Sequence, residues 1–466
     1  MIQIRQITLI LIAVLGFILI LFLLDGHVNW EVRATLAVTF LGIFLWITEM
    51  LSFGHTSIVI LVMYIIFQVA DLELILSGFA TGAVFLIIGG MMFANAVNST
   101  PLANRVVYFI LKYTGNSPNS LLFGIILIPQ ILAIFIPTAA VRVSLILPVI
   151  LSLISILQIH NEVGLKKQMM LAVSYGGTIS GIGLLPAAVS NVIVVELLYF
   201  YTGTIISYFD WFLYTFPIWF LSIPITWYVV KQSSSTEDLH LDNVKKETIQ
   251  QITKLGPLSR EELKCIIILV FTVMLWTTQP LHGLHPSVVT LLSAAVMGMP
   301  FIGVTEWKVI SKINIDTVLL VGTTMSIGIV MIETKSVDYL SSILFTDVSL
   351  AIISVPILSI ILLAVFVQLF HLGVSIVSTV VVTLVPVAIN LALQVGADPV
   401  LFVMTTGVAS LCGFILVIES VPNIMAYSTG LITQRDFIKP GVILTVISTI
   451  LLIVVAAIWW NFLGLY

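Results

Sequence analysis

Long apolar runs are the feature that most constrains this chain. Runs of roughly 18–25 apolar residues, the length that crosses a bilayer as one helix, recur along all 466 residues. Only 9% of the residues are charged and 60% are hydrophobic, whereas soluble domains carry about 25% charged residues. This composition excludes a soluble enzyme. With 18 Lys and Arg against 22 Asp and Glu, it also excludes a basic nucleic-acid-binding protein.

The apolar runs predict an all-α polytopic membrane protein with about 11 transmembrane helices. The first run follows Arg5 and is too long for the core of a signal peptide, and no small-residue cleavage site follows it. We therefore take it as the first span. The predicted spans are 7–24, 34–50, 56–70, 74–98, 168–200, 211–231, 263–280, 286–303, 315–333, 398–430 and 440–463.

Two further apolar stretches, 119–157 and 348–394, are each long enough for two spans. Small and hydroxyl residues interrupt both in the middle, at 137–140 and 375–379, but no polar loop separates their halves. We interpret both as re-entrant hairpins whose tips stop inside the membrane. Two tightly joined full spans are the alternative, and the pattern leaves it open.

The basic residues predict the orientation of the chain. If the N-terminus is cytoplasmic, every Lys and Arg except Arg33, Lys335 and Arg142 lies on the cytoplasmic side, as positively charged loops prefer. We therefore expect a multi-pass protein of the cell membrane with an external C-terminus. The first hairpin then opens from the cytoplasm and the second from outside.

The polar segment 232–262 divides the chain into two similar halves, and we expect it to be a cytoplasmic linker. The halves are 1–231 and 263–466; residues 85–92 correspond to 319–325, and Pro148 corresponds to Pro386. Because the two hairpins open to opposite sides, the halves are expected to be inverted repeats. This is an architecture of secondary transporters, which bind substrate near the midplane between broken helices.

Two predicted spans, 168–200 and 398–430, are too long for one crossing and contain residues that weaken helices. The interruptions are predicted at 174–186 and 409–423, where Gly, Pro, Ser and Thr cluster. Backbone carbonyls freed at such a break can hold a cation, and the N-termini of half-helices can hold an anion. A glycine-rich face for helix packing is the alternative interpretation.

These segments carry a family resemblance. The residues concerned are Gly176, Gly177, Ser180, Gly183 and Pro186 in the first break, and Ala409, Ser410, Phe414, Leu416, Ser420, Pro422 and Asn423 in the second. In this pattern the chain resembles the divalent anion–sodium symporter family over nearly its whole length. The resemblance implies an elevator motion, a homodimer, and a small anion as substrate, with a di- or tricarboxylate expected.

The resemblance also implies that no cofactor is needed beyond a coupling ion, Na⁺ or H⁺. Sulfate or another oxyanion, Na⁺/H⁺ exchange and an arsenite-type function remain alternatives. The chain contains no His-Glu-x-x-His or Asp-rich metal motif, so we expect no enzymatic activity.

The hairpin tips depart from the family pattern. That pattern is Ser-Asn-Thr ten residues before a proline, but here the positions read Thr138-Ala139-Ala140 and Ile376-Val377-Ser378. The first break also ends at Pro186-Ala187 without the final Asn of the family pattern, although Asn191 follows four residues later. We therefore expect a weak or absent requirement for Na⁺.

The substrate-binding candidates are Thr138, Ala139, Arg142, Ser375, Ser378, Thr379, Ser420, Pro422 and Asn423, and the candidates for ion or proton coupling are Ser174, Gly177, Thr178, Ser180, Ser410 and Glu419.

Two of these candidates are ionisable residues at predicted membrane depth, where a charge costs about 2.5–3.5 kcal/mol on an insertion scale. Arg142 is expected to supply the positive charge that a sodium ion would otherwise bring, and so to bind the anion. Glu419 is expected to couple transport to protons. Alternatively, Arg142 and Glu419 form a structural pair, or Arg142 bonds the carbonyls of the hairpin.

Overall fold

The computed structural model describes residues 2–23, 28–48, 50–156, 163–234, 242–344, 353–374 and 377–465, and within these ranges the regular elements are all helical. This confirms the all-α fold class. Five described helices are long and apolar enough to cross a membrane, or six if one bent pair counts as a single span. One of the five is Val377–Val395, the second arm of the predicted outward hairpin. Length alone therefore leaves the depth of that hairpin open.

The first half contains two predicted interruptions. One separates α7 from α8 at the tip of the first hairpin, and the other separates α9 from α10. The bent pair in the first half is α4 with η1 and α5, which meet at 42°. The elements are α1 (Ile2–Leu23), α2 (Trp30–Thr48), α3 (Phe53–Ile66), α4 (Leu72–Leu76), η1 (Ser77–Ala80), α5 (Gly82–Asn98), α6 (Leu102–Thr114), α7 (Pro118–Leu132), α8 (Ala139–Ile156), α9 (Val163–Ile179), η2 (Leu185–Ala187), α10 (Val189–Thr202) and α11 (Tyr208–Gln232).

The second half repeats this order after the linker helix α12 (Asp242–Leu255). Its last helix ends in a π-helical turn, η4 (Ala456–Trp460). The elements are α13 (Arg260–Thr277), α14 (Gln279–His282), α15 (Pro286–Met297), α16 (Trp307–Ile310), α17 (Ile315–Glu333), α18 (Ser336–Leu344), α20 (Pro356–His371), α21 (Val377–Val395), α22 (Pro399–Ser410), η3 (Val417–Glu419), α23 (Val421–Ser428) and α24 (Gln434–Val455).

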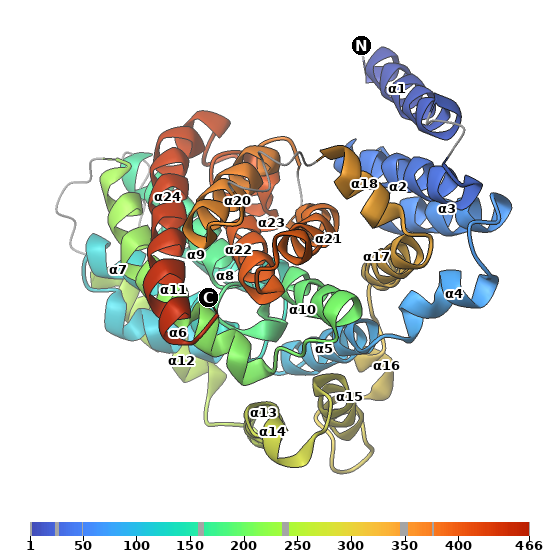
Figure 1. Cartoon of the computed structure of the whole chain (residues 1–466). Helices are drawn as coiled ribbons and strands as arrows, with labels where there is room; N and C mark the ends of the chain where they lie inside the picture. Colours follow the sequence, from blue (N-terminus) through green and yellow to red (C-terminus); the bar gives the residue numbers. More distant parts are fainter. Residues whose placement is uncertain are drawn as a thin grey trace.

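The two halves pack against each other in reciprocal pairs. Helix α5 of the first half packs on α15 of the second, and α17 of the second packs on α3 of the first. In the same way α10 contacts α21 and α22, while α23 contacts α8 and α9. Figure 1 shows α2, α3 and α17 together on one side of the molecule and α7, α11 and α24 on the other, with α8, α10, α21, α22 and α23 between them.

The breaks in the two long spans are shorter than predicted. Helix α9 continues to Ile179, past the Gly176-Gly177 pair, and α22 continues to Ser410. A Cβ on Gly176 would meet the backbone of Ile126 in α7, and one on Gly177 would meet Val143. The paired glycines therefore allow close helix packing, which was the alternative interpretation, and the true interruption begins after them.

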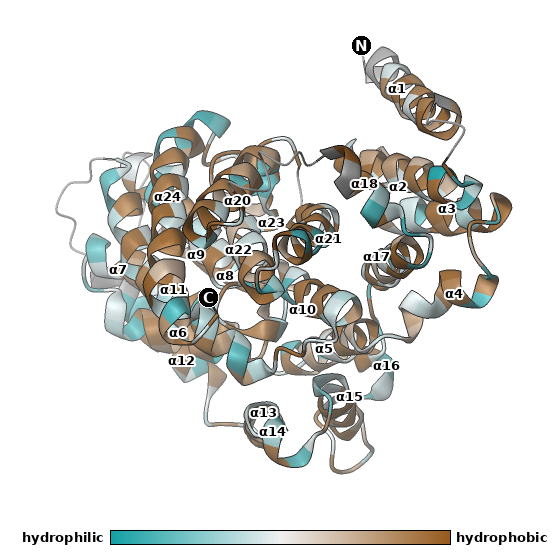
Figure 2. Ribbon diagram, viewed as in Figure 1, coloured by the Kyte–Doolittle hydropathy of each residue, from teal (hydrophilic) through white to brown (hydrophobic). Residues whose placement is uncertain are grey.

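Apolar side chains cover much of the outer surface. Large exposed examples are Phe22 on α1, Phe220 on α11, Phe271 on α13 and Ile450 on α24. Figure 2 shows hydrophobic residues along the lengths of the helices, and hydrophilic residues mainly at their ends and in the connections. Such an apolar surface is unfavourable in water and is buried in the hydrocarbon of a bilayer. The surface is therefore that of a membrane protein.

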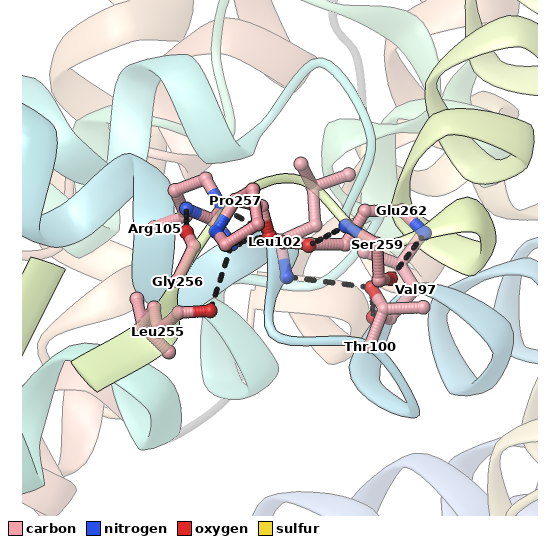
Figure 3. A network of polar contacts seen from close by, with 9 residues as sticks. All are labelled: Val97, Thr100, Leu102, Arg105, Leu255, Gly256, Pro257, Ser259 and Glu262. Carbon is pink, nitrogen blue, oxygen red and sulfur yellow. Dashed lines mark hydrogen bonds and ion pairs between the residues drawn. The ribbon is translucent and has the colours of Figure 1, made fainter. Parts of the chain in front are cut away.

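The linker is tied to the helical bundle through Arg105 of α6 (Figure 3). Its guanidinium donates to both carboxylate oxygens of Glu262, at 2.9 and 3.1 Å, and to the carbonyl of Gly256 at 2.9 Å. Glu262 in turn accepts from the backbone of Ser259 and caps the start of α13. One arginine thus joins α6, the end of α12 and the start of α13.

Candidate functional site

Both hairpins and both broken helices contribute to one cavity of about 280 Å³. Six of the predicted site residues line it together: Thr138, Ala139, Thr178, Ser378, Ser420 and Pro422. The other lining residues are Phe53, Ala140, Gly181, Ala188, Val189, Ser190, Thr317, Leu320, Val377, Leu411 and Val421. Residues predicted from separate segments of the chain therefore meet at a single place.

Four helices begin at the wall of this cavity. They are α8 at Ala139, α10 at Val189, α21 at Val377 and α23 at Val421, and the first residue of each lines the cavity. The first turn of a helix exposes unpaired backbone N–H groups and carries the positive end of the helix dipole. The arrangement therefore directs positive potential into the cavity from both halves of the chain.

The polar side chains at the cavity are hydroxyls, and no lining residue is charged. Thr178 at the end of α9 and Ser420 at the start of α23 share a hydrogen bond of 3.0 Å between their oxygens. Ser420 also accepts from the backbone N–H of Asn423, as the N-cap of α23. The two broken helices are thus joined directly at the cavity wall.

A buried asparagine holds each break together. Asn191 donates to the carbonyls of Gly181 and Leu184, ten and seven residues before it. Asn423 donates to the carbonyls of Gly413 and Leu416, also ten and seven residues before it. The expectation that the first break lacks its asparagine was therefore wrong. Asn191 fills this role, and its spacing from Gly181 was the signal in the sequence.

Three other predicted residues lie behind the cavity. Ser174 donates to the side-chain oxygen of Asn423 and so links α9 to α23. Gly177 packs against Val143, while Ser410 bonds the carbonyl of Gly407 within its own helix. The remaining tip candidate, Ser375, lies outside the described residues.

Arg142 is fully buried one turn into α8, and all its described contacts are to neutral oxygens. Its guanidinium donates to the hydroxyl of Ser180 at 3.0 Å, to the carbonyl of Ala187 at 3.0 Å and to the carbonyl of Ile136. These partners belong to the hairpin and the first break. Arg142 lies behind the cavity wall, and it does not pair with Glu419.

Glu419 lies in η3, in the second break, and is only 2% exposed. One carboxylate oxygen accepts from the backbone N–H of Ile415 at 2.9 Å. Its other oxygen, and the hydroxyl of Thr379 at the second hairpin, have no hydrogen-bond partner within the described part of the chain. Two buried oxygens of the second half, at the hairpin and at the break, are thus without a hydrogen-bond partner among the described residues.

Sequence reasoning missed the residues that face the broken helices from the other side. Phe53 begins α3, and Thr317 and Leu320 lie in the first two turns of α17. None belongs to a motif, and only the packing of α17 against α3 brings them to the cavity. Ser190 in the first turn of α10 was missed because the first break was predicted to end at Pro186, before this helix begins.

Comparisons with known proteins identify the family of the chain. A model described as the sodium:sulfate symporter transmembrane region matches residues 4–466. A protein of Cupriavidus necator named only as a membrane protein is 24% identical over 92% of this chain and 87% of its own length. The sodium-dependent dicarboxylate transporter SdcS of Staphylococcus aureus is 24% identical over 97% of this chain and 90% of its own length. The chain therefore belongs to the sodium:sulfate symporter family, whose members couple divalent anions to sodium.

Proposed function

We propose that this protein is a secondary active transporter that carries a small dicarboxylate or tricarboxylate together with sodium ions. The observation that carries the proposal is the convergence of four helix N-termini on a cavity lined by hydroxyl groups. Helix N-termini are natural anion sites, because backbone N–H groups and the helix dipole both favour negative charge. The name of the dicarboxylate transporter of S. aureus supports the substrate class.

Binding by helix N-termini suits a carrier better than binding by a fixed basic side chain at the cavity. The N–H groups have no pairing charge to lose when the substrate leaves, so release carries a smaller penalty. The hydroxyls of Thr138, Thr178 and Ser378 supply further donors for carboxylate oxygens. A cavity of about 280 Å³ is near the lower end of ligand pockets, which span about 300–1,000 Å³, so the substrate should be small.

The coupling cation should bind at the C-terminal ends of the helices that precede the breaks. Helices α9 and α22 end beside the cavity, where carbonyl groups carry the negative end of each helix dipole. Glu419 and Thr379 add oxygens in the second half. We therefore assign Na⁺ coupling chiefly to the second half, with proton coupling through Glu419 as the alternative.

The residues that meet at the cavity support an elevator motion and an assignment of the described state. The hairpins and broken helices form the moving part, and they meet the starts of α3 and α17, which belong to the scaffold in this proposal. With a cytoplasmic N-terminus both helices start on the cytoplasmic side. The described state would therefore be inward-facing, with the scaffolds of two copies forming the homodimer and the two halves acting as inverted repeats.

Uptake by purified protein in proteoliposomes tests the function. Labelled succinate, citrate and sulfate are offered in parallel with an inward Na⁺ gradient, a pH gradient or neither. The hairpin tips alone predicted a weak requirement for Na⁺, but the family and the sodium-dependent relative favour sodium coupling, so we expect saturable succinate or citrate uptake driven by Na⁺. Uptake of sulfate alone would reassign the substrate, uptake driven by pH alone would reassign the coupling ion, and no uptake of any anion would refute the proposal.

Labelling of single cysteines tests the orientation. A cysteine introduced near Lys245 in the linker should resist an impermeant thiol reagent added outside intact cells. Labelling from outside would reverse the topology and make the described state outward-facing.

A further inference from the structure

We propose that the guanidinium of Arg142 is a built-in cation that takes the place of a mobile coupling ion in the first half of the transporter. The first half would then bind no sodium ion of its own, and sodium coupling would come from the second half alone. This inference rests on the proposed function and adds to it the number and location of the coupling ions.

The surroundings of Arg142 are those of a bound cation. Its three described bonds go to two backbone carbonyls, of Ile136 and Ala187, and one hydroxyl, of Ser180. Neutral carbonyl and hydroxyl oxygens are also the ligands preferred by hard cations. These oxygens come from the hairpin and from the first break, so one cationic group closes the gap between the two elements.

The charge of Arg142 has no acidic partner in the described structure. The ion pairs found there are Arg105 with Glu262, Lys167 with Asp436 and His285 with Glu196. A fully buried, unpaired charge is unfavourable unless another charge lies near it. The backbone N–H of Arg142 bonds the carbonyl of Thr138, which lines the cavity, so an anion bound there is the natural counter-charge.

The second half differs at the corresponding positions. Counting back from the two break asparagines, Ala187 of the first half corresponds to Glu419 of the second, and Ser180 corresponds to Cys412. Counting back from the hairpin prolines, Arg142 corresponds to Val380, which is buried and uncharged. The second half therefore lacks the fixed cation and instead offers a carboxylate oxygen without a partner. This is the pattern expected if the cation of the first half is the side chain of Arg142 and the cation of the second half is a sodium ion bound from solution.

A purely structural clamp would make the same hydrogen bonds, so the test must separate charge from bonding. Purified Arg142→Ala, Arg142→Gln and Arg142→Lys are compared with the unaltered protein in proteoliposomes. Size-exclusion chromatography confirms that each is folded. Succinate uptake is measured against Na⁺ concentration, with and without added guanidinium. Arg105→Ala, which removes a half-buried arginine that is hydrogen-bonded at the linker, is the control.

We expect Arg142→Ala to lower uptake by roughly ten- to a hundredfold, the factor for one charge-assisted interaction. Added guanidinium should restore part of the rate, and high Na⁺ should restore part of it with a steeper activation curve, because a second ion now enters. Arg142→Lys should keep the shallow curve of the unaltered protein, since its charge remains. Arg105→Ala should show neither rescue nor a change in steepness.

Uptake by Arg142→Gln equal to that of the unaltered protein would overturn the inference, because hydrogen bonding alone would then suffice. So would a folded Arg142→Ala variant that neither guanidinium nor Na⁺ rescues. If Arg142→Ala does not fold, the Lys and Gln variants decide the question on their own. Failure of the unaltered protein to transport any anion would instead refute the proposed function.

Discussion

The two breaks share one framework and differ in their chemistry. Asn191 and Asn423 tie their loops with the same pair of hydrogen bonds, to carbonyls ten and seven residues before them. In the first break Arg142 donates to the hydroxyl of Ser180 and the carbonyl of Ala187, whereas in the second half Glu419 and Thr379 each have an oxygen without a partner among the described residues. In the proposed function, the symmetric part would position four helix N-termini for the anion. The asymmetric part would decide how many cations travel with it.

The largest effect is expected from the shared framework. Replacing Asn423 by Ala removes the donor to two loop carbonyls and the acceptor for Ser174, which is buried. Leaving buried polar groups unpaired costs about 1–3 kcal/mol each, so uptake should fall at least about a hundredfold. Asn191→Ala, which loses only the two carbonyl bonds, should fall less. Uptake assays on both variants measure the difference, and near-normal rates in either would show that the loops hold their shape without these bonds.

Glu419→Gln tests the charge of the carboxylate at which the two breaks differ. The amide oxygen can still accept from Ile415, so the change removes charge and keeps the described hydrogen bond. We expect the Na⁺ concentration for half-maximal uptake to rise by about tenfold, the effect of one lost charge–charge contact, with little change in maximal rate. An unchanged Na⁺ dependence combined with loss of pH-driven uptake would assign the carboxylate to protons instead.

A smaller effect is expected at the junction between the halves. Thr178→Val and Ser420→Ala each remove the hydrogen bond that joins the two breaks at the cavity, and Ser420→Ala also removes the N-cap of α23. A net hydrogen bond is worth about 1 kcal/mol, so KM for the anion should rise about fivefold in Thr178→Val and more in Ser420→Ala, because loss of a cap costs about 1 kcal/mol in addition. Because both changes remove the same contact, the double variant should be little worse than the poorer single one. Fully additive losses would mean that the two hydroxyls bind substrate independently.

The sequence predicted several residues that line the candidate cavity, but not the contacts of the residues around it. Small and hydroxyl residues inside apolar stretches were enough to find Thr138, Ser378 and Ser420, because polar groups inside a membrane segment must face protein or a cavity. Gly176 and Gly177 misled the prediction of the first break, since glycine weakens a helix and also permits close packing, and the sequence alone does not separate these uses. The contacts of Arg142 and the position of Phe53 depend on tertiary packing, which no local pattern encodes.

The smallest effect on transport is expected from Arg105, a half-buried arginine that lies outside both breaks. Arg105 bonds Glu262, and this hydrogen bond holds the pKa of that carboxyl below its ordinary value of 4.5. A depressed carboxyl pKa stabilises the folded state above the ordinary pKa, and the stabilisation is lost as the pH falls below it. Arg105→Ala should therefore lower thermal stability at neutral pH and narrow the difference in stability between neutral pH and pH below about 4.5. Unfolding followed by tryptophan fluorescence measures this, while Na⁺ activation of uptake should keep its shape. A changed activation curve would mean that an arginine far from both breaks also affects Na⁺ coupling. The effect of Arg142 could then not be assigned to a cation site in the first half.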